Sequence, residues 1–235
     1  MKKKVIFFSI LLIVLIIPIT IIYRYINFRR EMEKGNELFK ERVEEYIKEH
    51  FTSEIEILRV GKILGSGILS ASVRSVDNNV YFSITENYSL KDDYYESYFA
   101  KLLEKEFLPY AEDIFNGYKI RVVPVVESET FGNFNHLTLG EDAELKDVKN
   151  KIQRRFGVTF WIDKNLKIDD DNEKLYNLLH QVKKSEYTPN KVSFNFTKKG
   201  EKYGVFYRFT IEEIMEIDNI DDFTKIMQDK IKSET

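Results

Sequence analysis

The stretch "NKVSFNFTKKGEKYGVFYRFTI", residues 190–211, decides the fold class. In both halves apolar side chains alternate with polar ones, a period of two that is typical of strands with one solvated face. The segment KKGEK between the halves is typical of a hairpin turn. Alternating strands indicate antiparallel or mixed sheets, because strands of doubly wound parallel sheets are continuously apolar. The sequence therefore predicts an α+β fold.

This hairpin has two interpretations. At a sheet edge its aromatic strands would pair with a strand of a partner protein. Its basic tip instead favours a protected edge, because exposed lysines discourage strand pairing. We favour the protective interpretation, which rests on Lys198, Lys199 and Lys202.

Further strands and helices are predicted on both sides of residues 129–142, which resemble a linker. The first part, 31–128, reads α-β-β-β-α-β, and the second part, 143–235, reads α-β-α-β-β-α. About 100 residues in each part suffice for a small core. We therefore predict two small α+β units with antiparallel or mixed sheets.

Residues 1–30 read as a signal-anchor. Val5 to Tyr23 carries no charge, and a helix of that length spans roughly 28 Å, close to the ~30 Å hydrocarbon core of a bilayer. No small-residue cleavage site follows the run, which favours a retained transmembrane segment over a cleaved leader. Positive charges flank both ends, and the lysines packed against the N-terminal end favour an extracytoplasmic C-terminal part.

Charge excludes one class of partner. Residues 31–235 hold 30 basic and 39 acidic residues, a net charge of −9. Nucleic-acid binding rests on neutralising phosphates with a basic surface, so nucleic acid is not an expected partner. The chain has no cysteine, which excludes thiol chemistry and suits an exported protein.

Residue types that carry chemistry are sparse. His50, His136 and His180 lack a second ligand at metal spacing, so neither a zinc site nor another cofactor is expected. The run "KIDDDNEK", 167–174, lacks the offsets of a calcium loop and reads better as acids complementing a helix N-terminus. None of the common catalytic motifs occurs in the sequence. These observations predict no catalytic residues and no enzyme.

The most distinctive cluster is "DDYYESYF", residues 92–99. Tyr94, Tyr95 and Tyr98 do not share one helix face with Phe99. Tyrosine is enriched at protein interfaces, so one interpretation is an exposed aromatic contact patch. The alternative is that some of the rings pack on the sheet while the others cover neighbouring loops. We keep Tyr94, Tyr95 and Tyr98 as a candidate interaction surface.

The N-terminal lysines, the anchor and the helix "DDYYESYFAKLLEKEFLPYAEDIFNG" together resemble membrane-anchored proteins of low-GC Gram-positive bacteria, the YfjL-like group. The resemblance lies in the overall layout. It implies a membrane anchor and an extracytoplasmic domain, and it implies no activity and no site residues.

The sequence therefore predicts a single-pass membrane protein, anchored by residues 5–23. Its α+β part would bind another protein or a cell-envelope component outside the cell. Two alternatives stay open: an envelope hydrolase with dispersed catalytic residues, and a membrane accessory protein whose soluble part lies in the cytoplasm.

Overall fold

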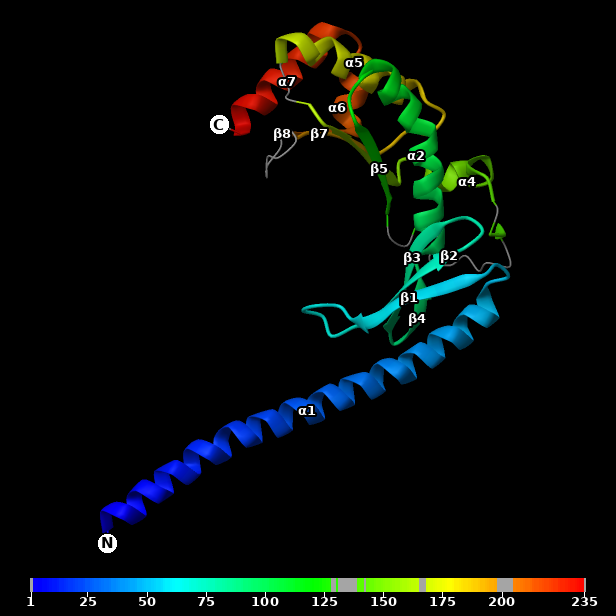
Figure 1. The fold of residues 1–235 in the computed structure, drawn as a ribbon. Helices are drawn as coiled ribbons and strands as arrows, with labels where there is room; N and C mark the ends of the chain where they lie inside the picture. The colour runs from blue at the N-terminus through cyan, green and yellow to red at the C-terminus, as the bar shows by residue number, and fades with distance from the viewer. Residues whose placement is uncertain are drawn as a thin grey trace. The chain divides into compact units, whose positions relative to one another are not determined.

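A computed structural model gives the fold (Figure 1). It describes residues 2–127, 130, 139–141, 143–164, 168–197 and 205–234, without the side chains of 2–18, 168–170 and 232–234. The elements follow one another as α1 (Lys2–His50), β1 (Ile55–Lys62), β2 (Leu69–Ser75), β3 (Val80–Asn87), β4 (Ser89–Asp92), α2 (Tyr94–Ile114), β5 (Ile120–Val126), α4 (Leu145–Ile152), β6 (Phe156–Ile162), α5 (Ile168–Lys184), β7 (Lys191–Phe196), β8 (Val205–Thr210), α6 (Ile211–Glu216) and α7 (Ile220–Glu234).

The predicted α+β class is confirmed. The strands form two four-stranded sheets, sheet A with the order β1-β2-β3-β4 and sheet B with the order β5-β6-β7-β8. The chain divides into two compact units. Unit 1 comprises residues 1–51, 55–74 and 83–92, and unit 2 comprises residues 52–54, 75–82 and 93–235.

In unit 1 the helix α1 runs without a break through Gly35, although glycine is a poor helix former. Phe39 and Val43 are fully buried on its inner side. Arg42 forms an ion pair with Glu86 of β3, and the hydroxyl of Tyr46 donates to Asp92 at 2.6 Å. The C-terminal half of α1 is therefore part of the core of unit 1.

Local turns follow from a few residues. Asn79, in the turn between β2 and β3, has a φ of +50°, a conformation that asparagine tolerates better than most residues. Ser89 and Asp92 begin and end β4, which pairs antiparallel with β3, and α2 begins after Asp93.

Sheet B in unit 2 is mixed. β5 pairs antiparallel with β6, β6 pairs parallel with β7, and β7 pairs antiparallel with β8. A parallel pair needs a crossover, and α5 supplies it between β6 and β7. Pro124 lies in β5, which is an edge strand of sheet B, the position in a sheet where proline is tolerated.

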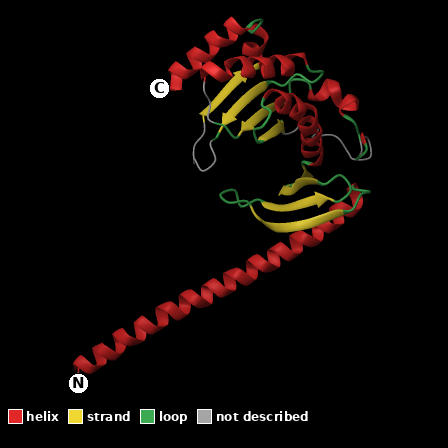
Figure 2. Cartoon of the chain, turned by 45° about the horizontal axis from the view of Figure 1, so that its top comes forward, coloured by secondary structure: helices red, strands yellow, loops and turns green. Residues whose placement is uncertain are grey.

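One face of sheet B carries the core of unit 2. Figure 2 shows helices gathered on this face, with the other face of the sheet free of them. Alternate strand residues point toward the helices and are buried; they are Val122, Val126, Phe156, Val158, Phe160, Ile162, Val192, Phe194, Phe196, Tyr207 and Phe209. Burying this many aliphatic and aromatic side chains, at roughly 1.5–3 kcal/mol each, is the main stabilising contribution.

The observed division differs from the predicted one at residues 31–128. The prediction placed α2 and β5 in the first unit, whereas the structure places both in unit 2. The reason is strand pairing, because β5 pairs with β6 over all seven of its residues. The predicted linker at 129–142 lies largely outside the described residues.

Within the described part of the chain, no helix has the length and apolar character needed to cross a membrane. The run Val5–Tyr23 forms part of α1, and most of its side chains lie outside the described residues. The anchor therefore stays a prediction.

Candidate functional site

The three tyrosines of the predicted contact patch lie inside unit 2. Tyr94, Tyr95 and Tyr98 are 0%, 3% and 9% exposed. The Tyr94 ring stacks on Tyr98 at 5.7 Å and meets Phe82 edge to face. The structure thus brings the three rings together as packing residues rather than as an exposed surface.

A polar network satisfies the hydroxyls of two of these rings. Tyr94 donates to the backbone oxygen of Glu141 at 2.9 Å, and Tyr95 donates to that of Gly140 at 3.3 Å. The Asn78 amide donates to both the Tyr94 hydroxyl and the Glu141 carbonyl. Buried phenols need such partners, so these contacts hold the segment around Glu141 against the start of α2.

The Glu141 carboxylate should make the stability of unit 2 depend on pH. It accepts hydrogen bonds from the Thr52 hydroxyl at 2.9 Å and from the Ser53 amide at 3.2 Å. Burial raises the pKa of Glu141, but the hydrogen bonds from Ser53 and Thr52 outweigh burial and lower the pKa overall. The ionised form is therefore the one that favours folding, and its contribution is lost as the pH falls through the lowered pKa.

We expect Glu141→Gln to lower the free energy of unfolding by about 1 kcal/mol at pH 7, since a charge-assisted acceptor becomes a neutral one. The difference from the wild type should shrink as the pH falls through the lowered pKa of Glu141, because the protonated carboxyl is then neutral like the amide. Urea unfolding at pH 7 and at lower pH values measures it. A difference that stays constant as the pH falls through this pKa would contradict the assignment.

Each of the two histidines that the structure describes stacks on a tyrosine of its own helix. His50 stacks on Tyr46 with ring centroids 4.0 Å apart, and His180 stacks on Tyr176. Burial and the neighbouring Lys184 and Lys183 lower the pKa of His180, so its ring is neutral at pH 7. His136 lies outside the described residues.

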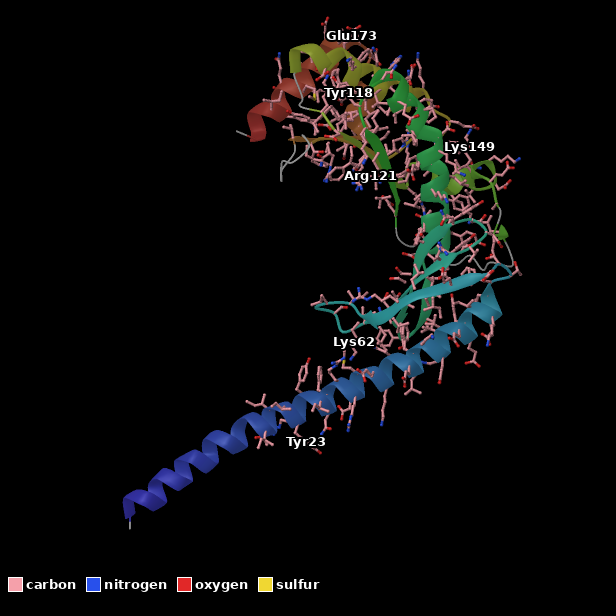
Figure 3. The ribbon with its side chains drawn as sticks, viewed as in Figure 1. Tyr23, Lys62, Tyr118, Arg121, Lys149 and Glu173 are labelled. Carbon is pink, nitrogen blue, oxygen red and sulfur yellow. The ribbon has the colours of Figure 1, made fainter. Side chains whose placement is uncertain are left out.

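The acidic run 167–174 opens a helix, because α5 begins at Ile168. Asp171 is fully buried and forms an ion pair with Lys164. Lys164 also lies 4.9 Å above the ring of Tyr118, which Figure 3 labels. Among the residues that the structure describes, no three acidic or histidine side chains lie close enough together to hold a metal ion.

The helix-free face of sheet B is the most distinctive surface of unit 2. It consists of the strand residues that alternate with the core positions. The strand register places them in three rows across the sheet: Arg121, Trp161, Asn195 and Phe206; Val123, Thr159, Ser193 and Arg208; Val125, Gly157, Lys191 and Thr210. Trp161, the one tryptophan of the chain, is half-buried on this face.

Two arginines on this face stack on aromatic rings. The Arg121 guanidinium lies 5.1 Å from the Trp161 ring, and that of Arg208 lies 5.4 Å from the Phe206 ring. Figure 3 labels Arg121 on β5. Such stacking fixes the orientation of the guanidinium plane against the aromatic ring. It leaves the guanidinium N–H groups free to donate hydrogen bonds to an anion.

Small polar side chains lie between the two arginine–aromatic pairs. Thr159, Ser193 and Asn195 occupy neighbouring strands in the middle of the face. The side-chain oxygen of Asn195 is buried and has no hydrogen-bond partner among the described residues. Buried polar atoms almost always have a hydrogen-bond partner. A ligand group that donates a hydrogen bond to this oxygen would supply one.

The charge of the helix-free face differs from that of the chain around it. Its twelve strand residues include Arg121, Lys191 and Arg208 and no acid, whereas residues 31–235 carry a net charge of −9. None of the three cations makes an ion pair within the described ranges. A local positive field on an acidic protein favours an anionic ligand.

A groove of about 450 Å³ continues this surface around the edge of β5. Ser97, Ala100, Lys101 and Glu104 of α2 line one side, with Arg121 and Val123 of β5 opposite. Glu127 and Lys119 flank β5 and hydrogen-bond to residues that flank β6. The Glu127 amide donates to the Arg155 carbonyl, and the Lys119 carbonyl accepts from the Asp163 amide. Alternation along an antiparallel pair then turns the main-chain groups of Val122 and Pro124 away from β6, toward the groove.

Pro124 limits what this edge accepts. Proline has no N–H, so the free edge of β5 lacks one donor in its middle. A strand added there would leave a carbonyl without a partner, which protects the edge from pairing. The side chains of the helix-free face, rather than the strand edge, are therefore the better candidate for recognition.

Sequence reasoning missed this face. The one signal was the identity of the residues between the core positions of each strand, such as Arg121, Trp161 and Arg208.

No family model matches the chain, and neither the curated proteins nor the solved structures include a match.

Proposed function

We propose that this chain is a membrane-anchored binding protein without catalytic activity, whose unit 2 binds an acidic polysaccharide of the cell envelope through the helix-free face of sheet B. The pair of stacked arginines on that face carries the proposal of ligand class. The anchor and the extracytoplasmic side are separate parts of the proposal and have their own support.

The support for the anchor lies in α1. Large apolar side chains between Ile19 and Phe28 are exposed on every side of the helix except the one that carries Thr20, Arg24 and Asn27; they are Ile19, Ile21, Ile22, Tyr23, Tyr25, Ile26 and Phe28. A helix with an apolar surface this wide is more stable in apolar surroundings than in water. These residues continue the uncharged run that starts at Val5, and Tyr23 and Tyr25 suit the membrane interface.

Cysteine labelling tests the anchor and its orientation. The chain has no cysteine, so Lys105→Cys on the exposed side of α2 gives one reactive thiol. We expect a membrane-impermeant maleimide to label this thiol in intact cells, with the protein in the membrane fraction. Labelling only after lysis would place unit 2 in the cytoplasm, and recovery in the soluble fraction would refute the anchor.

The chemistry of the helix-free face supports the ligand class. Guanidinium groups bind carboxylates and phosphates with paired hydrogen bonds. Flat aromatic rings such as Trp161 pack against the apolar side of a ring in a ligand. Thr159, Ser193 and Asn195 offer partners for hydroxyl groups. A polymer of sugar rings with acidic groups combines all three features, and an extracytoplasmic unit would meet such polymers.

Binding to polygalacturonate, as a probe polymer, should depend on the two stacked arginines. We expect Arg121→Gln with Arg208→Gln to weaken binding at least tenfold, since two charge-assisted contacts are lost. The full-length protein in nanodiscs is titrated with the polymer, and the fluorescence of Trp161, the one tryptophan, reports binding.

A matched control has the same change in charge elsewhere in unit 2. Lys105→Gln with Lys225→Gln alters two exposed lysines on helices, and this variant should bind as the wild type does. Neutral dextran should not bind to either protein. Equal affinity in the arginine variant and the lysine variant would show that the helix-free face is not the site.

A further inference from the structure

The hairpin that joins β1 to β2 ends in an apolar tip. Leu64 is fully exposed and Ile63 is 44% exposed. Gly65 and Gly67 have φ angles of +88° and +71°, a region that other residues rarely adopt. The chain is therefore built to turn sharply here while its two largest tip side chains point into solvent, which costs free energy in water.

The charges around the tip are of one sign. From Ile57 to Val76 the chain has three basic residues and no acidic residue; the basic residues are Arg59, Lys62 and Arg74. This stands out in residues 31–235, where acids exceed bases by nine. Arg74 is paired with Glu56, so Arg59 and Lys62 supply the local positive charge beside the tip.

The position of the tip in unit 1 is set by α1. Ile55 and Ile57 of β1 line a groove of about 350 Å³ together with Glu44, Ile47 and Lys48 of α1. From there β1 runs back along α1 toward its N-terminal half, as Figures 1 and 2 show. Lys62, at the end of β1, and Tyr23 of α1 are labelled in Figure 3.

The lengths of β1 and α1 show which residues of α1 lie level with the hairpin tip. Seven residues of strand from Ile57 to Leu64 cover about 23 Å. At ~1.5 Å per residue this equals roughly 15 residues of helix. Counting back from Glu44 reaches the neighbourhood of Arg29. The tip is therefore level with the turn of α1 that follows the exposed apolar segment ending at Phe28.

We propose that this hairpin tip is a second membrane contact, in which Ile63 and Leu64 insert at the headgroup level while Lys62 and Arg59 face anionic lipid. The inference rests on the proposed anchor. With Tyr23 at the edge of the hydrocarbon core, the neighbourhood of Arg29 lies about 9 Å further out along the helix, at the outer limit of the headgroup layer, so the side chains of the tip reach the headgroups from there. An apolar pair beside basic residues is the composition that binds this layer.

The bilayer is favoured over a protein partner because of where the tip lies. The anchor would hold the tip at the membrane surface, so insertion costs little further loss of freedom. Charges more than about 10 Å from the lipid are largely screened, so the basic residues beside the tip count for more in this contact than acidic residues further from it.

The experiment uses full-length protein with one cysteine, Leu64→Cys, carrying an environment-sensitive nitrobenzoxadiazole label. The protein is reconstituted into vesicles of neutral phosphatidylcholine with 30% phosphatidylglycerol. The control is Asp77→Cys, an exposed position beyond the opposite end of β2. We expect the emission at position 64 to be at least twice that at 77. Nitroxide-labelled lipids should quench the label at 64 at least twofold more strongly.

The outcomes separate the inference from the anchor. Co-flotation of the protein with the vesicles reports the anchor, and it is read before any fluorescence. If the protein floats but both labels emit as in water, the anchor stands and the tip contact is refuted. If the label at 64 is bright but lipid nitroxides do not quench it, the tip packs on protein, which also overturns the inference.

A variant gives an independent readout. Ile63→Ser with Leu64→Ser keeps the glycines that shape the turn and removes the apolar pair. A label at Lys62→Cys should then lose its quenching by lipid nitroxides, while co-flotation stays unchanged. Quenching that is unaltered in the serine variant would show that these two side chains do not hold the tip in lipid.

Discussion

Replacing Asp171 with alanine is expected to lower the free energy of unfolding of unit 2 by about 3–5 kcal/mol, because one partner of a buried ion pair is removed. Asp171 is fully buried, and the Lys164 side chain is only 13% exposed. Without the carboxylate, the ammonium group of Lys164 keeps the cost of its burial and loses its counter-charge. Contact with the Tyr118 ring offsets only part of that cost.

Urea unfolding followed by Trp161 fluorescence measures this effect. Two further variants make the result specific. Asp221→Ala removes an exposed acid from the start of α7 and should cost less than about 1 kcal/mol. The double variant Lys164→Met with Asp171→Leu removes both charges and should recover most of the stability. A loss below 1 kcal/mol for Asp171→Ala would mean that the pair is not buried in solution.

Phe209→Ala should be comparably damaging, with a loss of about 3–5 kcal/mol, since it opens a cavity in the core of unit 2. Phe209 of β8 is fully buried. Its ring meets Phe194 edge to face at 5.9 Å and stacks on Phe223 of α7 at 5.5 Å. The ring therefore connects the sheet to a helix, and its loss removes contacts on both sides.

The neighbouring Phe206 provides a control of the same chemistry. It lies on the same strand but on the helix-free face, and it is half-buried. Phe206→Ala should cost less than about 1.5 kcal/mol, because solvent fills the space that the ring leaves. The midpoint of unfolding in urea, measured with an unchanged slope, gives both values. Equal losses for the two variants would contradict the assignment of the two faces.

Alternation of side chains was enough to predict the hairpin strands of residues 190–211. Phe194, Phe196, Tyr207 and Phe209 occupy alternate positions of β7 and β8, and all four are buried. The division into units was not predictable in the same way. The pairing of β5 with β6 joins segments that are far apart in the sequence. The residues of β5 alone do not indicate which strand it pairs with.

The tyrosines show a second limit of sequence reasoning. A single helix face does not hold Tyr94, Tyr95 and Tyr98 together with Phe99, so some rings were expected to be exposed. In the structure the start of α2 is covered from more than one side, by Phe82 of β3 and by the segment at Gly140. Helical periodicity describes one packing surface, and these covering segments come from elsewhere in the chain.

Trp161 shows that alternation indicates the face of a strand residue more reliably than residue type does. A tryptophan is apolar enough for the core, but the alternation of Phe160, Trp161 and Ile162 puts it on the opposite face from its buried neighbours. Prediction of the candidate site would also have required the order and register of the strands. Only these place Arg121, Trp161 and Phe206 in one row across the sheet.

The continuity of α1 has a mechanical consequence. The same helix that carries the exposed apolar residues up to Phe28 also supplies Phe39 and Val43 to the core of unit 1, with no break between them. A rod of this kind has no hinge, so any tilt or rotation of its N-terminal half is imposed directly on sheet A. It also offers proteases no extended backbone between Ile19 and His50, so unit 1 should resist shedding by limited proteolysis in that interval.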